Sequence, residues 1–155
     1  MLKNKIYKVL AAAVLTTLST VQTSAGTSLP QPTTKGFIGL NWTFGASNGA
    51  ELVLGVAHGQ AAFLPGCSSV SGAKAEVRIG LQDGVGLRSA RVSGFSGGRD
   101  FQAEGGVGYD FTQGDVFFTA GANGDNFAVG GSYGLNGGLG GYAGVHSIGS
   151  FCAVR

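Results

Sequence analysis

Residues 74–82 read KAEVRIGLQ, and this stretch decides the fold class. Two alternating sets of side chains make it up: Ala75, Val77, Ile79 and Leu81 are apolar, whereas Lys74, Glu76, Arg78 and Gln82 are polar or charged. Because successive residues of a β-strand point to opposite faces, the alternation predicts a strand with one apolar and one charged face. Asp83 and Gly84 follow, a pair typical of tight turns. The stretch therefore predicts a strand that turns into an antiparallel neighbour.

The same alternation recurs on both sides of this stretch. Eight strands are predicted, at 37–45, 50–59, 74–82, 85–95, 101–111, 116–121, 127–135 and 139–148. Most are joined by turns of three to five residues, and such short turns connect only antiparallel neighbours. The longest irregular connection is 60–72. In the fourth strand, Arg88 and Arg91 fall on opposite faces, which leaves its register open.

Glycine dominates the composition after the first 25 residues. All 30 glycines lie among the remaining 130 residues, far above the usual share of ~7%. The chain has only 3 prolines and no strict Gly-X-Y period, which excludes collagen. A helical bundle is excluded because each glycine inside a helix costs ~1 kcal/mol. The composition indicates a β protein.

The first 25 residues have the pattern of a secretory signal. Lys3, Lys5 and Lys8 precede a ten-residue, mostly apolar run at 9–18, which is too short to span a bilayer as a helix. Removal of this segment leaves seven basic and eight acidic side chains, a net charge of −1. Without a basic patch, we expect no nucleic-acid partner. Export to an oxidising compartment also favours a disulfide between Cys67 and Cys152.

Eight antiparallel strands fit either a soluble barrel or sandwich with its apolar face inward, or a membrane barrel with that face toward lipid. The opposite face is mostly Gly, Ala, Ser and Thr, which suit the narrow interior of an eight-stranded barrel. Five charges on that face are expected to pair inside the barrel: Lys74, Glu76, Arg78, Glu104 and Asp110. Alternating segments of ~10 residues are typical of membrane barrels. Aromatic residues near the strand ends are compatible with interfacial girdles: Trp42, Phe44, Phe101, Tyr109, Phe111, Phe117, Phe118, Phe127 and Tyr133.

With this signal, strand number and alternation, residues 36–151 resemble the small eight-stranded outer-membrane barrels of Gram-negative bacteria. The resemblance implies that both termini lie on the periplasmic side, which places the connection with Cys67 and the tail with Cys152 at the same rim. Two features depart from the class. The chain continues beyond Phe151, where such barrels usually end in an aromatic residue, and the predicted outer turns are shorter than the class commonly has.

Residues that could support catalysis are few. A histidine base needs a nucleophile or carboxylate within reach, and Ser147 points to the opposite strand face from its neighbour His146. Glu51, Glu76 and Glu104 could act as paired carboxylates, although charge balance against nearby basic residues accounts for them equally simply. The sequence therefore predicts no enzymatic activity, no cofactor and no metal site.

Together these observations predict a signal peptide at 1–25, a flexible leader at 26–35 and a single domain at 36–155. The expected fold is an all-β, eight-stranded antiparallel up-and-down barrel of the transmembrane type with a glycine-rich interior. We expect an exported outer-membrane protein with a structural, non-enzymatic role and the lipid bilayer as its partner. Two alternatives stay open: a soluble periplasmic or extracellular β domain for binding or surface assembly, and, less favoured, a lipid-modifying barrel enzyme.

Overall fold

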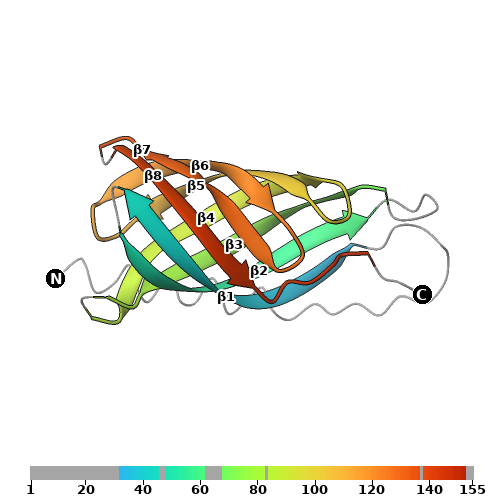
Figure 1. The fold of residues 1–155 in the computed structure, drawn as a ribbon, viewed down its shortest axis with the longest axis horizontal. Coiled ribbons are helices and arrows are strands. Elements are labelled where there is room, and N and C mark those ends of the chain that lie inside the picture. The colour runs from blue at the N-terminus through green and yellow to red at the C-terminus, as the bar shows by residue number, and fades with distance from the viewer. Residues whose placement is uncertain (1–31, 46–47, 62–67, 83, 137, 153–155) are drawn as a thin grey trace.

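The computed structural model describes residues 32–45, 48–61, 68–82, 84–136 and 138–152. The strands are β1 (Thr33–Gly45), β2 (Gly49–Ala61), β3 (Val70–Gly80), β4 (Gly86–Gly97), β5 (Gln102–Asp110), β6 (Asp115–Asn123), β7 (Phe127–Gly134) and β8 (Gly138–His146). Each strand pairs antiparallel with the next, and β8 pairs with β1 to close the barrel (Figure 1). The predicted all-β, eight-stranded antiparallel barrel is confirmed.

The register gives the barrel a strong stagger. A path that starts at Thr33 and moves from each residue to its pair partner on the next strand passes once around the barrel. It returns to β1 at Thr43, ten residues after its start. A stagger of this kind requires strands that are tilted against the barrel axis, typically by ~35–45°. We call the end where β1 begins and β8 ends the termini rim. The opposite end, where β1, β3, β5 and β7 end, is the hairpin rim.

Strand bounds differ from the predictions mainly at the termini rim. β1 begins at Thr33, inside the expected leader, because Thr33 and Thr34 pair with β2. Likewise β2 continues to Ala61 and β3 begins at Val70, which shortens the connection expected at 60–72. The part of that connection at 62–67 lies outside the described residues.

A β-bulge settles the register of β4. The pairing shifts between positions 78 and 79 of β3, where β4 carries one extra residue, Arg88. A bulge adds a residue on one strand only and so reverses its alternation beyond that point. Consequently Arg88 and Arg91 both face inward, although their spacing predicts opposite faces.

Inward glycines make room for large side chains on neighbouring strands. A Cβ atom on Gly55 would lie 2.6 Å from the ring of Phe37, and one on Gly130 would lie 2.7 Å from the hydroxyl of Tyr142. By contrast, a Cβ atom on the outward Gly131 would meet only a backbone oxygen at 3.6 Å, an ordinary contact. Interior packing therefore requires the inward glycines.

Residues 147–152 form a strap across the termini rim. β8 ends at His146 rather than at the predicted position 148, and the chain then turns at Gly149, whose φ of 65° suits glycine. Ile148 and Cys152 of the strap are buried. The Nζ atom of Lys35 donates to the carbonyl oxygen of Ile148 at 3.3 Å, which holds the strap against β1.

The strap completes an apolar core inside the termini rim. Two clusters of buried side chains form it: Phe37, Val53, Ala57 and Ile148, and next to them Val70, Phe95 and Cys152. The ring of Phe151 packs against both clusters. The lumen is therefore closed by apolar packing at this end.

Candidate functional site

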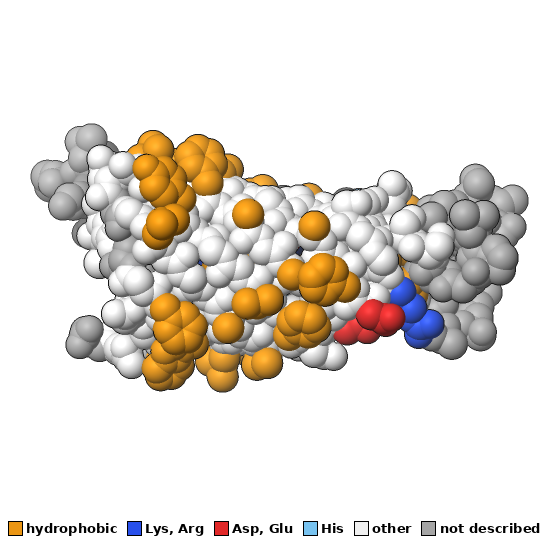
Figure 2. Space-filling model, turned by 45° about the horizontal axis from the view of Figure 1, so that its top comes forward, with side chains coloured by type: hydrophobic (Ala, Val, Ile, Leu, Met, Phe, Trp, Pro, Cys, Tyr) orange, Lys and Arg blue, Asp and Glu red, His pale blue; other side chains and the backbone are white. Residues whose placement is uncertain are grey.

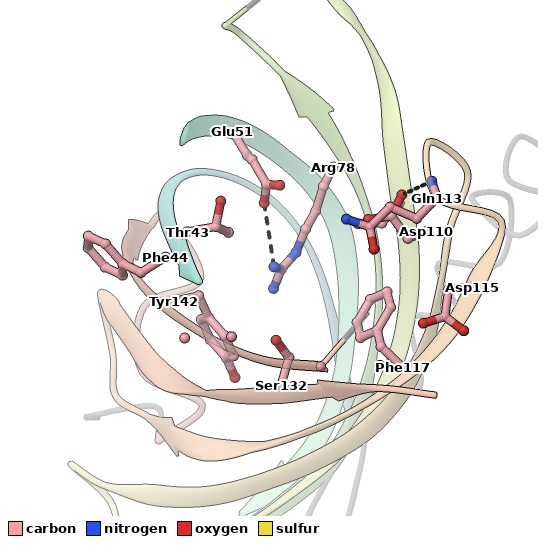
Figure 3. A pocket seen from close by; sticks show the side chains of 15 residues that line it. Thr43, Phe44, Glu51, Arg78, Asp110, Gln113, Asp115, Phe117, Ser132 and Tyr142 are labelled. Atoms are coloured by element: carbon pink, nitrogen blue, oxygen red, sulfur yellow. Dashed lines mark hydrogen bonds and ion pairs between the residues drawn. The ribbon is translucent and has the colours of Figure 1, made fainter. Parts of the chain in front are cut away.

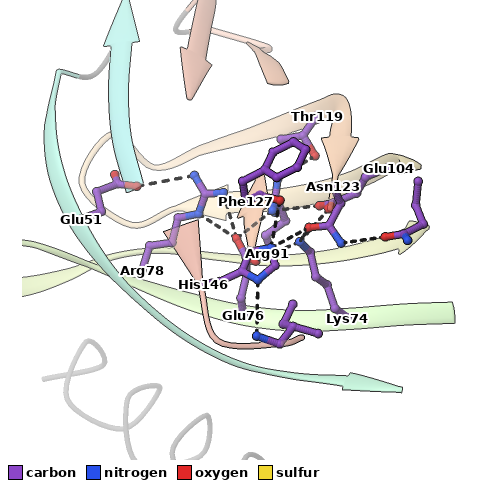
Figure 4. Close-up of polar contacts among 12 residues, drawn as sticks. Glu51, Lys74, Glu76, Arg78, Arg91, Glu104, Thr119, Asn123, Phe127 and His146 are labelled. Atoms are coloured by element: carbon purple, nitrogen blue, oxygen red, sulfur yellow. Dashed lines mark hydrogen bonds and ion pairs between the residues drawn. The ribbon is translucent and has the colours of Figure 1, made fainter. Parts of the chain in front are cut away.

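Seven charged side chains meet inside the barrel and form what we call the lumen network: Glu51, Lys74, Glu76, Arg78, Arg88, Arg91 and Glu104. Figure 4 labels all of them except Arg88. They come from β2, β3, β4 and β5, where each occupies an inward position. Six of the seven side chains are at most 5% exposed, and Arg88 is 19% exposed. The network therefore lies in the protein interior.

Glu76 lies at the centre of the lumen network. Its Oε1 atom is 2.9 Å from Nη2 of Arg78 and 2.9 Å from Nη2 of Arg91. Arg91 also lies 2.9 Å from Oε1 of Glu104, whose Oε2 is 2.6 Å from Nζ of Lys74. Charges of opposite sign thus alternate along a continuous chain of contacts from Lys74 to Arg78.

Toward the hairpin rim, the chain of contacts continues through Glu51 to Arg88. The Oε2 atom of Glu51 lies 3.5 Å from Nη1 of Arg78, and its Oε1 atom lies 3.2 Å from Nε of Arg88. The inward turn of Arg88 at the bulge makes the second contact possible. β2 and β4 are thereby linked through side chains as well as through β3.

Tyr142 of β8 packs against the guanidinium groups of two network members. The guanidinium carbons of Arg78 and Arg91 each lie 5.0 Å from the centre of its ring. Cations over an aromatic face are attracted by its negative charge density, and the attraction is strongest where water is excluded. Gly121 of β6 and Gly130 of β7 leave the space that this ring occupies. Tyr142 therefore connects the network to the far wall of the barrel.

Polar side chains extend the lumen network toward the termini rim. Lys74 donates to Oδ1 of Asn123 at 3.4 Å, and Nδ2 of Asn123 donates to Gln102 at 3.4 Å. Nε2 of His146 lies 3.0 Å from Oδ1 of Asn123. The neighbouring Ser147 instead accepts a hydrogen bond from the backbone N–H of Ile38 through Oγ at 3.1 Å. His146 and Ser147 thus contact different groups, and the histidine belongs to the lumen.

The charge balance of the lumen network favours structural cross-linking. Three carboxylates face four cations, and each has at least one partner of opposite sign. Removing charges from water carries a large desolvation cost, which close pairing offsets only with good geometry. Loss of one member is therefore costly, because it leaves a buried charge uncompensated.

A cavity of about 60 Å³ lies between the lumen network and the hairpin rim (Figure 3). Glu51 and Arg78 form its floor, and Asp110, Asp115 and Gln113 line its side. Its polar lining suits ordered water, since about 10–15 Å³ of such accessible volume is enough to hold one molecule.

The predicted interior charges separate into two places. Lys74, Glu76, Arg78 and Glu104 meet in the lumen network, whereas Asp110 lies at the hairpin rim. There Oδ1 of Asp110 accepts the backbone N–H groups that follow it, including that of Thr112 at 2.8 Å. Position at a strand end explains this role, since an aspartate readily binds the backbone of its own turn.

Two central residues of the site, Arg91 and Tyr142, were not predicted from the sequence. Arg91 is 2% exposed and contacts two carboxylates, but the bulge at Arg88 hides its inward position from the alternation. Tyr142 is 3% exposed, and the glycine-rich β8 gives too weak an alternation to place it. Tyr142 pairs with the inward Gly130, and a large residue opposite a glycine is the feature that could have identified it.

The outer wall of the barrel carries the apolar side chains. Ile38, Leu40, Trp42 and Phe44 of β1 alternate with buried residues and are 50–52% exposed. Other strands repeat this arrangement, with exposed Leu54, Val92, Val107, Phe118, Val129, Tyr133 and Val145. Within the eight strands as described, every charged residue occupies an inward position. On the face drawn in Figure 2, hydrophobic side chains are spread along the wall, and the plainly visible charged side chains lie near the termini rim.

Most of the aromatic residues expected at strand ends lie on the outer wall. Seven of them are exposed: Trp42, Phe44, Phe101, Tyr109, Phe118, Phe127 and Tyr133. Phe111 packs edge-on against Tyr109, with ring centres 5.3 Å apart. The expectation was wrong for Phe117, which faces inward over Gly108 and lines the cavity.

Of the two cysteines, Cys152 lies within the part of the chain that the structure describes. Cys152 is 7% exposed and packs beside Val70 and Phe95. Cys67 lies outside the described residues, so its pairing with Cys152 stays a prediction.

Comparisons with known proteins leave the geometry as the basis for a functional argument. No family model, no curated protein and no solved structure matches the chain. Among the residues described, no group of three or more His, Cys, Asp and Glu side chains is placed to hold a metal ion. In the same part of the chain, no helix is long and apolar enough to cross a membrane.

Proposed function

We propose that the protein is a small outer-membrane β-barrel with a structural, non-enzymatic role in the cell envelope. The observation that carries this proposal is the inverted polarity of the wall. Charged side chains face the lumen, and apolar side chains such as Leu40, Trp42 and Val107 face outward with 46–52% of their surface exposed. A protein that folds in water buries its apolar side chains instead.

Lipid is the surrounding that makes this arrangement stable. An outward Arg or Lys at the middle of a bilayer costs ~2–4 kcal/mol, and the outward strand positions carry neither. Closure of the barrel pairs the edges of β1 and β8, as lipid requires of every spanning sheet. Exposed aromatic residues gather near the hairpin rim, including Trp42, Tyr109 and Tyr133, where an interfacial girdle would lie.

The lumen supports a structural role over transport. The lumen network and the ring of Tyr142 packed against it fill the interior, and the apolar core closes it at the termini rim. Eight strands give a barrel just wide enough for side chains to fill. We therefore assign the charges to holding the barrel walls together and not to moving a solute.

Export and a disulfide complete the proposal. The segment 1–25 directs the chain out of the cytoplasm, and a bond between Cys67 and Cys152 would tie the strap to the β2–β3 connection. Mass analysis of the mature protein without reductant should show no thiol that reacts with iodoacetamide. Two reactive thiols would exclude the bond.

Cell fractionation tests the proposed location. We expect the protein in the outer membrane, resistant to carbonate extraction, and migrating faster in SDS gels when unheated, as folded membrane barrels do. Recovery in the soluble fraction would contradict the proposal and favour the soluble β domain.

A further inference from the structure

On β1–β4, the polarity of both faces of the wall reverses along the barrel axis. On β4, the outward residues change from Val92 to Ser96 toward the termini rim, while the inward residues change from Arg91 to Phe95. On β3, inward Glu76 and Lys74 give way to Gly72 and Val70 over the same levels. On these two strands, the outward and inward faces therefore exchange polarity over the same levels.

The outward polar side chains beyond this height form a continuous surface, which we call the collar: Thr34, His58, Gln60, Ser71 and Ser96. Gln60 pairs with Ser71 and Ser71 with Ser96, so the three lie on adjacent strands. Thr34 and His58 are also paired, and their side chains lie within hydrogen-bonding distance, 2.8 Å apart. The collar thus crosses β1, β2, β3 and β4.

The inner face of the collar is apolar. Phe37, Ala57, Val70 and Phe95 are each at most 7% exposed, and the strap covers them with Ile148 and Cys152. Polar outside and apolar inside is the arrangement of a protein in water. Above the collar, the ion pairs face inward and the exposed apolar side chains face outward, the arrangement expected in lipid.

We propose that the barrel meets two solvents along its axis, with the lipid boundary on the termini side lying between Val92 and Ser96 of β4. The part toward the hairpin rim is embedded in the bilayer, and the collar with the strap stands in water. This inference rests on the proposed membrane location and adds where the membrane ends. The strand lengths agree with it, since β1–β4 have 11–13 residues whereas β5–β8 have 8–9.

The height of the apolar part matches a bilayer. On β3, the outward apolar run begins at Ala73 and continues past the strand end to Leu81. At ~3.3 Å per residue this run covers about 26 Å along the strand. With a tilt of ~40° it rises about 20 Å along the axis, close to the ~25 Å apolar band of membrane barrels. At the hairpin rim, exposed apolar side chains reach the described part of the turn between β7 and β8, where Leu135 and Leu139 are 59% and 77% exposed.

Site-specific tryptophan quenching tests the boundary. The only tryptophan, Trp42, is first replaced in a Trp42→Phe variant, and Val92→Trp or Ser96→Trp is then added. Both positions face outward on β4, so they differ in height alone. Each protein is folded into dilauroyl-phosphatidylcholine vesicles with or without a brominated lipid, and its fold is checked by the gel shift on heating. Iodide serves as the quencher in water.

We expect brominated lipid to reduce the emission of Val92→Trp and iodide to reduce that of Ser96→Trp. Quenching of both by lipid would overturn the boundary while leaving the membrane location intact. Quenching of both by iodide would overturn the membrane location itself, and the reverse pattern would overturn the assigned orientation of the two parts. Leu54→Trp and Gln60→Trp on β2 form a second pair, which decides the outcome if either β4 variant fails the gel-shift check.

Discussion

Neutralising Glu76 is the sharpest test of the lumen network. In a Glu76→Gln variant, the carboxylate that contacts both Arg78 and Arg91 at 2.9 Å becomes uncharged. Arg78 then keeps only Glu51 at 3.5 Å, while Arg91 keeps Glu104 at 2.9 Å. With three carboxylates against four cations, the network goes from a net charge of +1 to +2.

The size of the effect follows from burial. The side chain of Glu76 is 2% exposed, and its partners are 5% and 1% exposed, so water compensates little of the lost contact. Removing one partner of a buried ion pair typically costs ~3–5 kcal/mol. Because each arginine keeps a second carboxylate, we expect the free energy of unfolding to fall by about 3 kcal/mol, the low end of that range.

Asp110→Asn supplies a matched control. This change also removes one inward carboxylate, but from the turn at the hairpin rim, where an amide oxygen can still accept the N–H groups of Thr112 and Gln113. We expect the free energy of unfolding to change by less than ~1 kcal/mol, the scale of one ordinary hydrogen bond. Urea unfolding in lipid vesicles, followed by Trp42 emission, measures both variants. Trp42 is 50% exposed on the outer wall, so its emission would report the loss of the proposed contact with lipid.

Equal unfolding midpoints for the two variants would refute the reasoning, since they would indicate that the central charges are solvated. A double variant, Glu76→Gln with Arg78→Met, adds a second criterion. Removing the arginine charge restores the net charge of +1 and should recover part of the lost stability. Further loss in the double variant would mean that Arg78 stabilises the barrel independently of Glu76.

Three further outcomes follow from the same structure. Val107→Arg places a charge on the outer wall and should lower the stability of the inserted barrel by ~2–4 kcal/mol, measured by urea unfolding in vesicles. Gly130→Ala should lower the yield of folded protein, measured as the fraction that changes its gel migration on heating, because the added Cβ would lie 2.7 Å from the Tyr142 hydroxyl. Position 131 faces outward, so Gly131→Ala should leave this yield unchanged. Tyr142→Ala should lower the free energy of unfolding by ~3–5 kcal/mol through the cavity it creates, whereas Tyr142→Phe keeps the ring between the arginines and should cost far less.

The number of strands and the face to which each side chain points were predictable, because both depend on the local alternation of apolar and polar residues. In β3, Lys74, Glu76 and Arg78 differ so strongly from the intervening residues that the inward face is evident from the sequence. The pairing partners of these charges were not predictable in the same way. Arg91 joins Glu76 only because the extra residue at position 88 shifts the alternation of β4, and a bulge leaves no distinct mark in the sequence.

Glycine-rich segments limited the prediction at the end of the barrel. Alternation requires two kinds of side chain, and β8 reads GLGGYAGVH, with little contrast between its faces. The apolar Ile148 then looked like a continuation of the strand. Its true position in the strap depends on the turn at Gly149 and on contacts with Lys35, which lies more than a hundred residues away.

The inward glycines follow from the large side chains that fill the lumen. A barrel that faces lipid must place its polar groups inside, and an eight-stranded barrel offers little room there. Arginine, lysine and tyrosine are among the largest side chains, so their neighbours on adjacent strands must be small. Tyr142 lies over Gly121 and Gly130, and the ring of Phe37 lies over Gly55. Glycine at these positions weakens each strand by ~0.5–1 kcal/mol relative to alanine, a cost that the packed side chains offset. Inward glycine and inward charge are therefore two consequences of the same narrow wall, which we propose faces lipid.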